Sequence, residues 1–96
     1  MDKGEKKNLK DAAKILQKLS HPLRLELVLK LLEDRCCVKK IGEEFNLPQA
    51  STSQHLKQLR EAGVVEDNRK GNHVEYCLRD PWIIDLLNFL KNSIKL

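Results

Sequence analysis

Residues 38–65 read VKKIGEEFNLPQASTSQHLKQLREAGVV, and this stretch decides the fold. Ile41 and Phe45 stand about one helical turn apart, which predicts a brief helix. Pro48 is tolerated in the first turn of a helix, so it opens a second one. Gly63 is the residue type that most often ends a helix in a left-handed conformation. We therefore predict two helices joined by a tight turn.

A β-hairpin follows these two helices. Residues 64–65 begin one strand, and Val74, Tyr76 and Leu78 alternate along a second. Between the strands, residues 70–72 read Lys-Gly-Asn, and glycine and asparagine tolerate the positive φ that a tight hairpin turn requires. The order helix, turn, helix, hairpin predicts a winged helix-turn-helix, which is a mainly α fold with a small β-hairpin wing.

Three further helices are predicted outside this motif, over about residues 8–19, 22–32 and 81–94. The last helix carries an apolar stripe that is too wide for a terminal helix on a small monomer. We therefore predict a homodimer whose interface is formed by the first and last helices. The expected interface residues are Leu9, Leu16, Trp82, Ile83, Leu86, Leu87 and Leu90.

Length and composition restrict the class of protein. The 96 residues suffice for one domain over 1–96, with residues 1–7 expected to be a flexible basic tail. No apolar run approaches the roughly 20 residues that cross a bilayer, and the charged N-terminus lacks a secretory signal. We therefore expect a cytoplasmic protein with reduced cysteines. The net charge of +4 permits a polyanionic partner without requiring one.

The second helix of the motif is polar at its start, which is what a recognition helix needs to reach base edges in the major groove. Glutamine side chains can bind adenine in a bidentate manner, whereas lysine and arginine farther along suit phosphates. A basic hairpin tip suits the DNA backbone or the minor groove. We predict double-stranded DNA as a partner, bound by Gln49, Ser51, Thr52, Ser53, Gln54, His55, Lys57, Arg60, Arg69 and Lys70.

The charge of this predicted surface favours an alternative. Between residues 49 and 78, four basic residues are balanced by the four acidic residues Glu61, Glu66, Asp67 and Glu75. A neutral surface also suits a winged helix that binds protein, and the salt dependence of DNA binding separates the two functions. An enzyme is not expected, because the sequence has no glycine-rich phosphate loop and no nucleophile elbow.

Residues 19–25 (LSHPLRL), 49–65 (QASTSQHLKQLREAGVV) and 69–76 (RKGNHVEY) resemble the ArsR/SmtB group of winged-helix repressors. The resemblance spans about residues 16–90. It implies a homodimer built on the first and last helices, and an operator complex that blocks a promoter until an inducer arrives. By position it also implies DNA contacts at Gln49, Ser51, Ser53, Gln54 and His55, with the wing at Arg69 and Lys70. Pro48 and Ala50 depart from the serines of many relatives.

The metal sites of that family are not matched here. One uses Asp-x-His at the start of the last helix, but Asp80 is followed by Trp82 at the histidine position. Another uses Cys-Val-Cys, but this chain reads Cys37-Val38-Lys39. No metal cofactor is therefore assigned from the family.

The three cysteines suggest a thiol-reactive inducer instead, such as arsenite, an oxidant or reactive sulfur. Cys37 precedes the third helix and two lysines, and both features lower the pKa of a thiol, so it is expected to be the reactive member. Cys36 is expected to point inward. If the link before the third helix pairs with the second hairpin strand, Cys77 approaches these two. Three thiolates would then hold a soft metal or metalloid, or two would form a disulfide or polysulfide. The alternative is a DNA-binding dimer with silent cysteines and no inducer.

The three histidines receive different assignments. His55 lies on the recognition helix and is assigned to DNA, His21 precedes a proline and is assigned to the turn there, and His73 is expected to be exposed.

Overall fold

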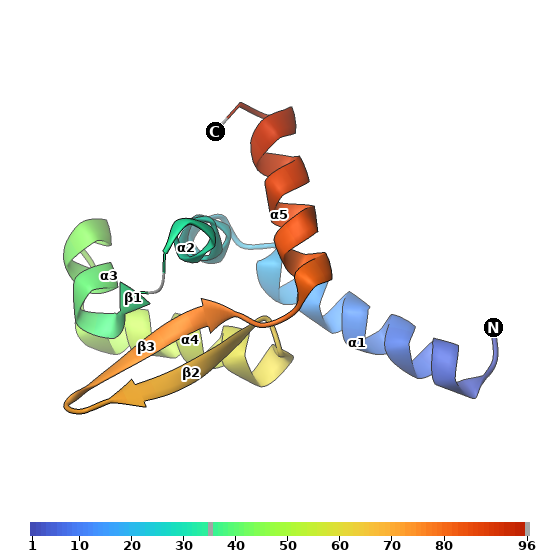
Figure 1. The fold of residues 1–96 in the computed structure, drawn as a ribbon, viewed down its shortest axis with the longest axis horizontal. Coiled ribbons are helices and arrows are strands. Elements are labelled where there is room, and N and C mark those ends of the chain that lie inside the picture. The colour runs from blue at the N-terminus through green and yellow to red at the C-terminus, as the bar shows by residue number, and fades with distance from the viewer. Residues whose placement is uncertain (35, 96) are drawn as a thin grey trace.

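A computed structural model describes residues 1–34 and 36–95, without the side chains of Cys36 and Cys37. Five helices and a small sheet follow one another along the chain (Figure 1). Their bounds are α1 (Lys3–Leu19), α2 (Pro22–Glu33), β1 (Cys36–Cys37), α3 (Val38–Phe45), α4 (Gln49–Ala62), β2 (Val65–Lys70), β3 (His73–Leu78) and α5 (Pro81–Ser93). The predicted winged helix-turn-helix fold is confirmed.

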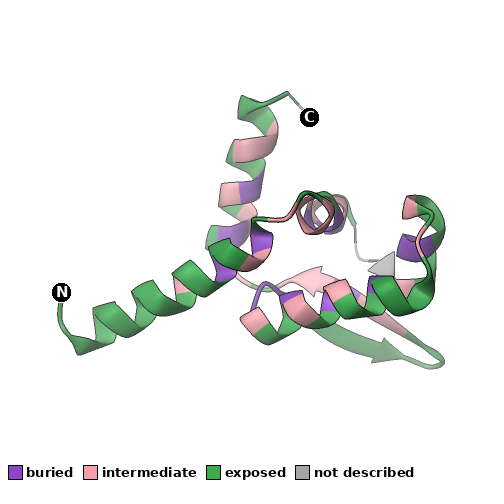
Figure 2. Cartoon of the chain, turned by 180° about the vertical axis from the view of Figure 1, so that it is seen from behind, coloured by how far each residue is buried: buried purple, intermediate pink, exposed green. Residues whose placement is uncertain are grey.

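Helix α1 is longer than the sequence suggested. It begins at Lys3 because the Asp2 side chain accepts a hydrogen bond from the Glu5 backbone N–H at 2.8 Å, which caps the helix. The expectation of a flexible tail over residues 1–7 is therefore wrong for residues 3–7. The first half of α1 extends away from the rest of the protein (Figure 1), and exposed residues follow most of its length (Figure 2).

The sheet joins the wing to the start of the helix-turn-helix. Its strand order is β1-β3-β2, and both pairings are antiparallel. The short β1 pairs with β3, with Cys36 opposite Tyr76 and Cys37 opposite Glu75. The predicted pairing of this link with the second hairpin strand is confirmed. The wing turns at Gly71, whose φ of 58° suits glycine.

The core lies between α2, α4, the wing base and α5. Leu27, Val28, Leu56 and Leu59 contribute to it from α2 and α4, and all four are fully buried. Ile83 and Leu87 of α5 are also fully buried within the single chain, so assigning them to a dimer interface is wrong. Helix α5 thus uses one side to complete the protomer, which leaves the other side for different contacts.

The tight turn between α3 and α4 depends on local geometry. Asn46 adopts a positive φ of 53°, and the Leu47 N–H donates to the Gly42 carbonyl at 2.9 Å. A side chain at Gly42 would meet the Leu47 carbonyl at 3.2 Å and the Thr52 hydroxyl at 3.3 Å. The two helices therefore pack closely enough here to favour glycine.

Candidate nucleic-acid interface

Helix α4 separates its residues into a buried and an exposed face. Thr52, Leu56 and Leu59 form the buried face. The polar residues expected to contact DNA lie largely on the exposed one: Gln49, Ser51, Ser53, Gln54 and Lys57 are all exposed. The start of the helix has no side-chain cap, since Pro48 occupies the N-cap position. Helix α4 therefore presents a polar, solvent-facing first turn, as a recognition helix requires.

Thr52 does not fit the predicted DNA contact. Its side chain is fully buried, and its hydroxyl donates to the Pro48 carbonyl at 3.2 Å. This hydroxyl also packs against Gly42 of α3. We correct the assignment: Thr52 fastens α4 to the turn before it.

The wing and the recognition helix border one hollow of about 360 Å³. Gln49 and Ser53 line it from α4, Lys39 lines it from α3, and His73 lines it from the wing. The expectation that His73 is exposed is confirmed. The sequence analysis did not assign Lys39 or His73 to this surface. The signal was the pairing of β1 with β3, which draws the start of α3 toward the wing.

The basic residues of this surface differ in how they are paired. Arg60 forms an ion pair with Asp67 of the wing at 3.1 Å, and Lys57 pairs with Glu61 at 4.0 Å. The neutral charge count thus arises partly because these two cations have acidic neighbours. Arg69 and Lys70 are exposed near the wing tip. Neither forms an ion pair within the described part of the chain.

His55 lies beside the start of α2. Its Nδ1 accepts a hydrogen bond from Nε of Arg24 at 3.4 Å, and its ring centroid is 5.2 Å from that of His21. Burial lowers the pKa of His55, and the charges of Arg24 and His21 lower it further. His21 caps α2 by accepting from the backbone N–H groups of Leu23 and Arg24, which confirms its assignment to the turn.

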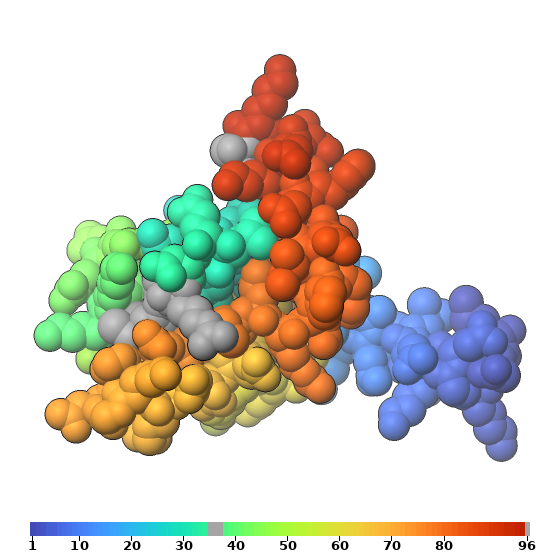
Figure 3. Space-filling view, viewed as in Figure 1, coloured from blue at the N-terminus to red at the C-terminus, as the bar shows by residue number. Residues whose placement is uncertain are grey.

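An apolar surface lies on the other side of the protein. A hollow of about 400 Å³ between α1, α2 and α5 is lined mainly by leucines and by Phe89. The sequence analysis omitted Phe89 from the interface, although its side chain is 73% exposed. Helix α5 and the first half of α1 stand out from the body of the molecule (Figure 3). Of the predicted interface residues, Leu9, Leu16 and Trp82 are exposed, whereas Leu86 and Leu90 are half-buried.

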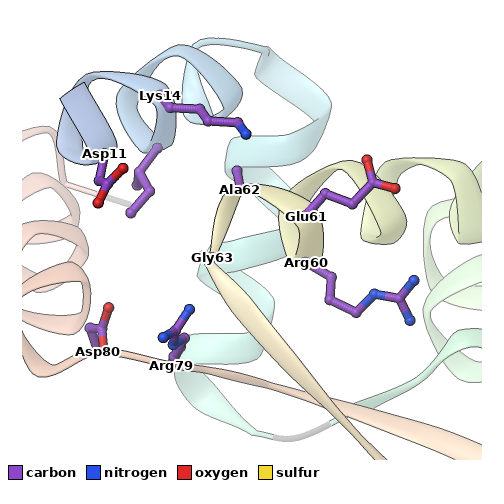
Figure 4. Close-up of a pocket in the computed structure, with 9 residues that line it drawn as sticks. Asp11, Lys14, Arg60, Glu61, Ala62, Gly63, Arg79 and Asp80 are labelled. Carbon is purple, nitrogen blue, oxygen red and sulfur yellow. The ribbon is translucent and has the colours of Figure 1, made fainter. Parts of the chain in front are cut away.

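A second hollow of about 340 Å³ lies where α1, the end of α4 and the link from β3 to α5 meet (Figure 4). Asp11 and Lys14 reach it from α1, and Arg79 and Asp80 from the link. Arg79 reaches toward Gly63, where a side chain would come within 3.1 Å of its Nη1. Charges of both signs line this hollow, so it has no clear preference for an ion of either sign.

The thiol hypothesis is described only in part. Cys77 is half-buried on β3, and its Sγ donates to Oε1 of Glu66 at 3.7 Å. The side chains of Cys36 and Cys37 lie outside the described residues, so the reactivity of Cys37 and the inward position of Cys36 stay predictions. Among the side chains that are described, no three His, Cys, Asp or Glu residues are placed to hold a metal ion.

The described helices were also examined for membrane-spanning segments. None of them combines the length and apolar character that crossing a bilayer requires.

Comparison with known proteins identifies the family. Residues 21–67 match the bacterial regulatory protein model of the arsR family. The chain is 42% identical over 69 residues to the HTH-type transcriptional repressor SmtB of Mycobacterium tuberculosis, an alignment that covers 72% of this chain and 51% of that protein. This chain therefore spans about half the length of that relative. It is 37% identical over 90 residues to the transcriptional repressor PagR of Bacillus anthracis, with 90% of each chain covered.

The fold comparison agrees. A homodimeric winged helix-turn-helix DNA-binding domain, Mb0332 of Mycobacterium bovis, superposes with a TM-score of 0.88 at 19% identity, covering 99% of this chain and 88% of that one. The protein is thus of the winged helix-turn-helix class. The chain belongs to the arsR family of bacterial regulatory proteins, and the relatives described above are repressors rather than enzymes.

Proposed function

We propose that this chain is a transcriptional repressor that binds operator DNA as a homodimer in the cytoplasm. The observation that carries the proposal is the exposed, polar start of α4 beside the wing hollow. A recognition helix enters the major groove with its first turns, while a wing contacts the neighbouring backbone. Family membership supports the same function, because SmtB and PagR are named as repressors.

The side chains divide into two kinds of DNA contact. Gln49, Ser51, Ser53 and Gln54 are short donors and acceptors that suit base edges. Lys39 of α3 and the wing residues Arg69 and Lys70 suit phosphates, because flexible cations gain from counterion release whatever the sequence. Arg60 and Lys57 contribute less, since Asp67 and Glu61 already neutralise them.

The dimer forms through α1 and α5. Their exposed apolar side chains continue into the hollow that Leu16, Leu86, Phe89 and Leu90 help to line. A second copy covers this surface and removes it from water, which is the main favourable term in protein association. Mb0332, which shares the fold, is a homodimer. Two recognition helices in one dimer then read two half-sites of an operator.

The inducer acts, in this proposal, through thiol chemistry centred on Cys37. The backbone of Cys37 directly precedes α3 and lies opposite Glu75, two residues before Cys77 on the same strand. Modification here acts on the strand that joins the wing to the helix-turn-helix. An oxidant that accepts two electrons and two protons would join two thiols as a disulfide, and arsenite would instead bind the thiolates.

Fluorescence anisotropy with duplex DNA from upstream of the coding sequence tests the DNA-binding function. Gln54→Ala should weaken binding to the preferred duplex by about 1–3 kcal/mol and binding to unrelated duplex much less. Glu26→Gln is the matched control, because Glu26 is exposed on α2 away from this surface. Equal affinity of the wild type for all duplexes would reject operator recognition.

The inducer requires a separate test. Limited alkylation followed by mass spectrometry should modify Cys37 faster than Cys77, and arsenite or oxidant should release the DNA. If Cys37 reacts no faster than Cys77 and neither reagent affects binding, the cysteines are silent and the repressor has no thiol inducer.

A further inference from the structure

Arg24 and His55 connect α2 to the recognition helix across 31 positions of sequence. Nε of Arg24 donates to Nδ1 of His55 at 3.4 Å, and Arg24 is itself half-buried. The Arg24 backbone N–H points in turn to Nδ1 of His21, at 3.5 Å. One arginine thus contacts two imidazoles through different donors.

The direction of the hydrogen bond to His55 fixes where the ring proton lies. A guanidinium group has five N–H donors and no acceptor, and it does not lose its proton in proteins. Nδ1 of His55 must therefore be the acceptor, so it carries no proton. In the neutral imidazole the proton then resides on Nε2.

We propose that Arg24 is a positioning residue of the DNA interface: it holds His55 in the Nε2–H tautomer, so that Nε2 donates a hydrogen bond to a backbone phosphate of the operator. The proposal rests on the DNA-binding function proposed above, and it assigns a role to a residue that does not belong to the recognition helix. A phosphate oxygen only accepts, so only a ring nitrogen that carries a proton can bind it.

The position of His55 on α4 favours a phosphate over a base. Gln49 and Ser53 line the hollow on the wing side of the helix. His55 lies on the other flank, one turn before Gln58, whose side chain accepts from Lys18 of α1 at 2.8 Å. The flank of a recognition helix faces the edge of the groove, where the DNA backbone lies, whereas its tip faces the bases.

The electrostatics of this flank make the tautomer relevant near neutral pH. The charged and titratable groups around His55 are Arg24 and His21 of α2, with Lys18 of α1 farther along the flank. Burial and the positive charge of Arg24 lower the pKa of His55. The ring therefore stays neutral at pH 7, and a neutral ring has one proton whose position Arg24 selects.

Imidazole nitrogen-15 NMR of the free protein tests the first half of the proposal. The wild type should show His55 as the Nε2–H tautomer. Arg24→Met, which removes the donor and the charge, should raise the His55 pKa toward the ordinary value and populate the Nδ1–H tautomer. Arg24→Lys should restore both properties in part, because it keeps a donor and a positive charge. An unchanged tautomer and pKa in Arg24→Met would overturn the proposal, and thermal melts confirm that each variant is folded.

A double-mutant cycle on DNA tests the second half. The amide of asparagine can replace Nδ1 but not Nε2, whereas that of glutamine can place a donor near Nε2. We expect His55→Asn to weaken operator binding by roughly two- to tenfold and His55→Gln to weaken it less. Arg24→Met should weaken binding by a similar factor alone, and by less than about twofold in the His55→Asn background.

The cycle separates this inference from the proposed function. Additive effects of the two substitutions, or full affinity in His55→Asn, would overturn the role of Arg24 even if Gln54→Ala still weakens binding. In that case operator recognition stands and only the inference fails. If the wild type binds no DNA, both fail together.

Discussion

Helices α4 and α5 are nearly equal in length, at 14 and 13 residues, yet they present opposite surfaces to solvent. Each has a buried face that completes the same core. The remaining face of α4 is polar at its start, with Gln49, Ser53 and Gln54 exposed. That of α5 is apolar, with Trp82 and Phe89 exposed. The exposed face, rather than the buried one, therefore distinguishes a helix that meets a polyanion from a helix that meets a second copy.

The largest expected effect breaks the buried face of α5. Ile83→Ala should lower the free energy of unfolding by about 2–5 kcal/mol, because it removes a fully buried side chain and leaves a cavity. Urea unfolding at a fixed protein concentration measures this. A loss below about 0.5 kcal/mol would mean that Ile83 does not belong to the protomer core.

The exposed face of α5 should respond differently. Phe89→Ala should leave the folded protomer intact and raise the dimer dissociation constant, because the ring is 73% exposed in the single chain. Losing the burial of one phenylalanine costs about 1.5–3 kcal/mol, which corresponds to roughly a 10- to 100-fold change. Sedimentation equilibrium measures this, with Asn92→Ala on the same helix as a control. An unchanged dissociation constant would place the interface elsewhere.

These two residues show where sequence analysis stops. Helical periodicity placed Ile83, Leu87 and Leu90 on one stripe, but it cannot tell which apolar residues meet their own chain and which meet another. The fold itself was predictable, because Pro48 and Gly63 mark the ends of α4 locally. The start of α1 was missed because the capping role of Asp2 lies within a lysine-rich segment that resembles a solvated tail.

The same limit applies to the DNA surface. The polar start of α4 was visible in the sequence, but Thr52 lies among these polar residues and turns inward to the Pro48 carbonyl. The contact between Arg24 and His55 joins residues 31 positions apart. No local pattern indicates it, because it depends on how α2 packs against α4.

A smaller effect sharpens the division of contacts on the DNA surface. Lys70→Ala should weaken binding to every duplex by a similar factor and reduce the slope of log affinity against log salt by about 1. Anisotropy titrations on preferred and unrelated duplexes measure both quantities. A loss confined to the preferred duplex would show that Lys70 reads bases and not phosphates.

The smallest effect concerns Thr52. Thr52→Val keeps the shape of the side chain but removes its hydrogen bond to Pro48, so the free energy of unfolding should fall by about 0.5–1.5 kcal/mol. DNA affinity should not change, because the side chain is fully buried. A fall in operator affinity with unchanged stability would restore Thr52 as a DNA contact.

The salt dependence of DNA binding tests the central claim most directly. The affinity of the wild-type protein for its upstream duplex would be measured by anisotropy at several salt concentrations between about 50 and 200 mM. A repressor whose dimer contacts 6–10 phosphates should lose about 10³–10⁵ in affinity over this range. Binding that is absent or insensitive to salt would contradict DNA recognition, and it would favour a winged helix that binds protein through its neutral surface.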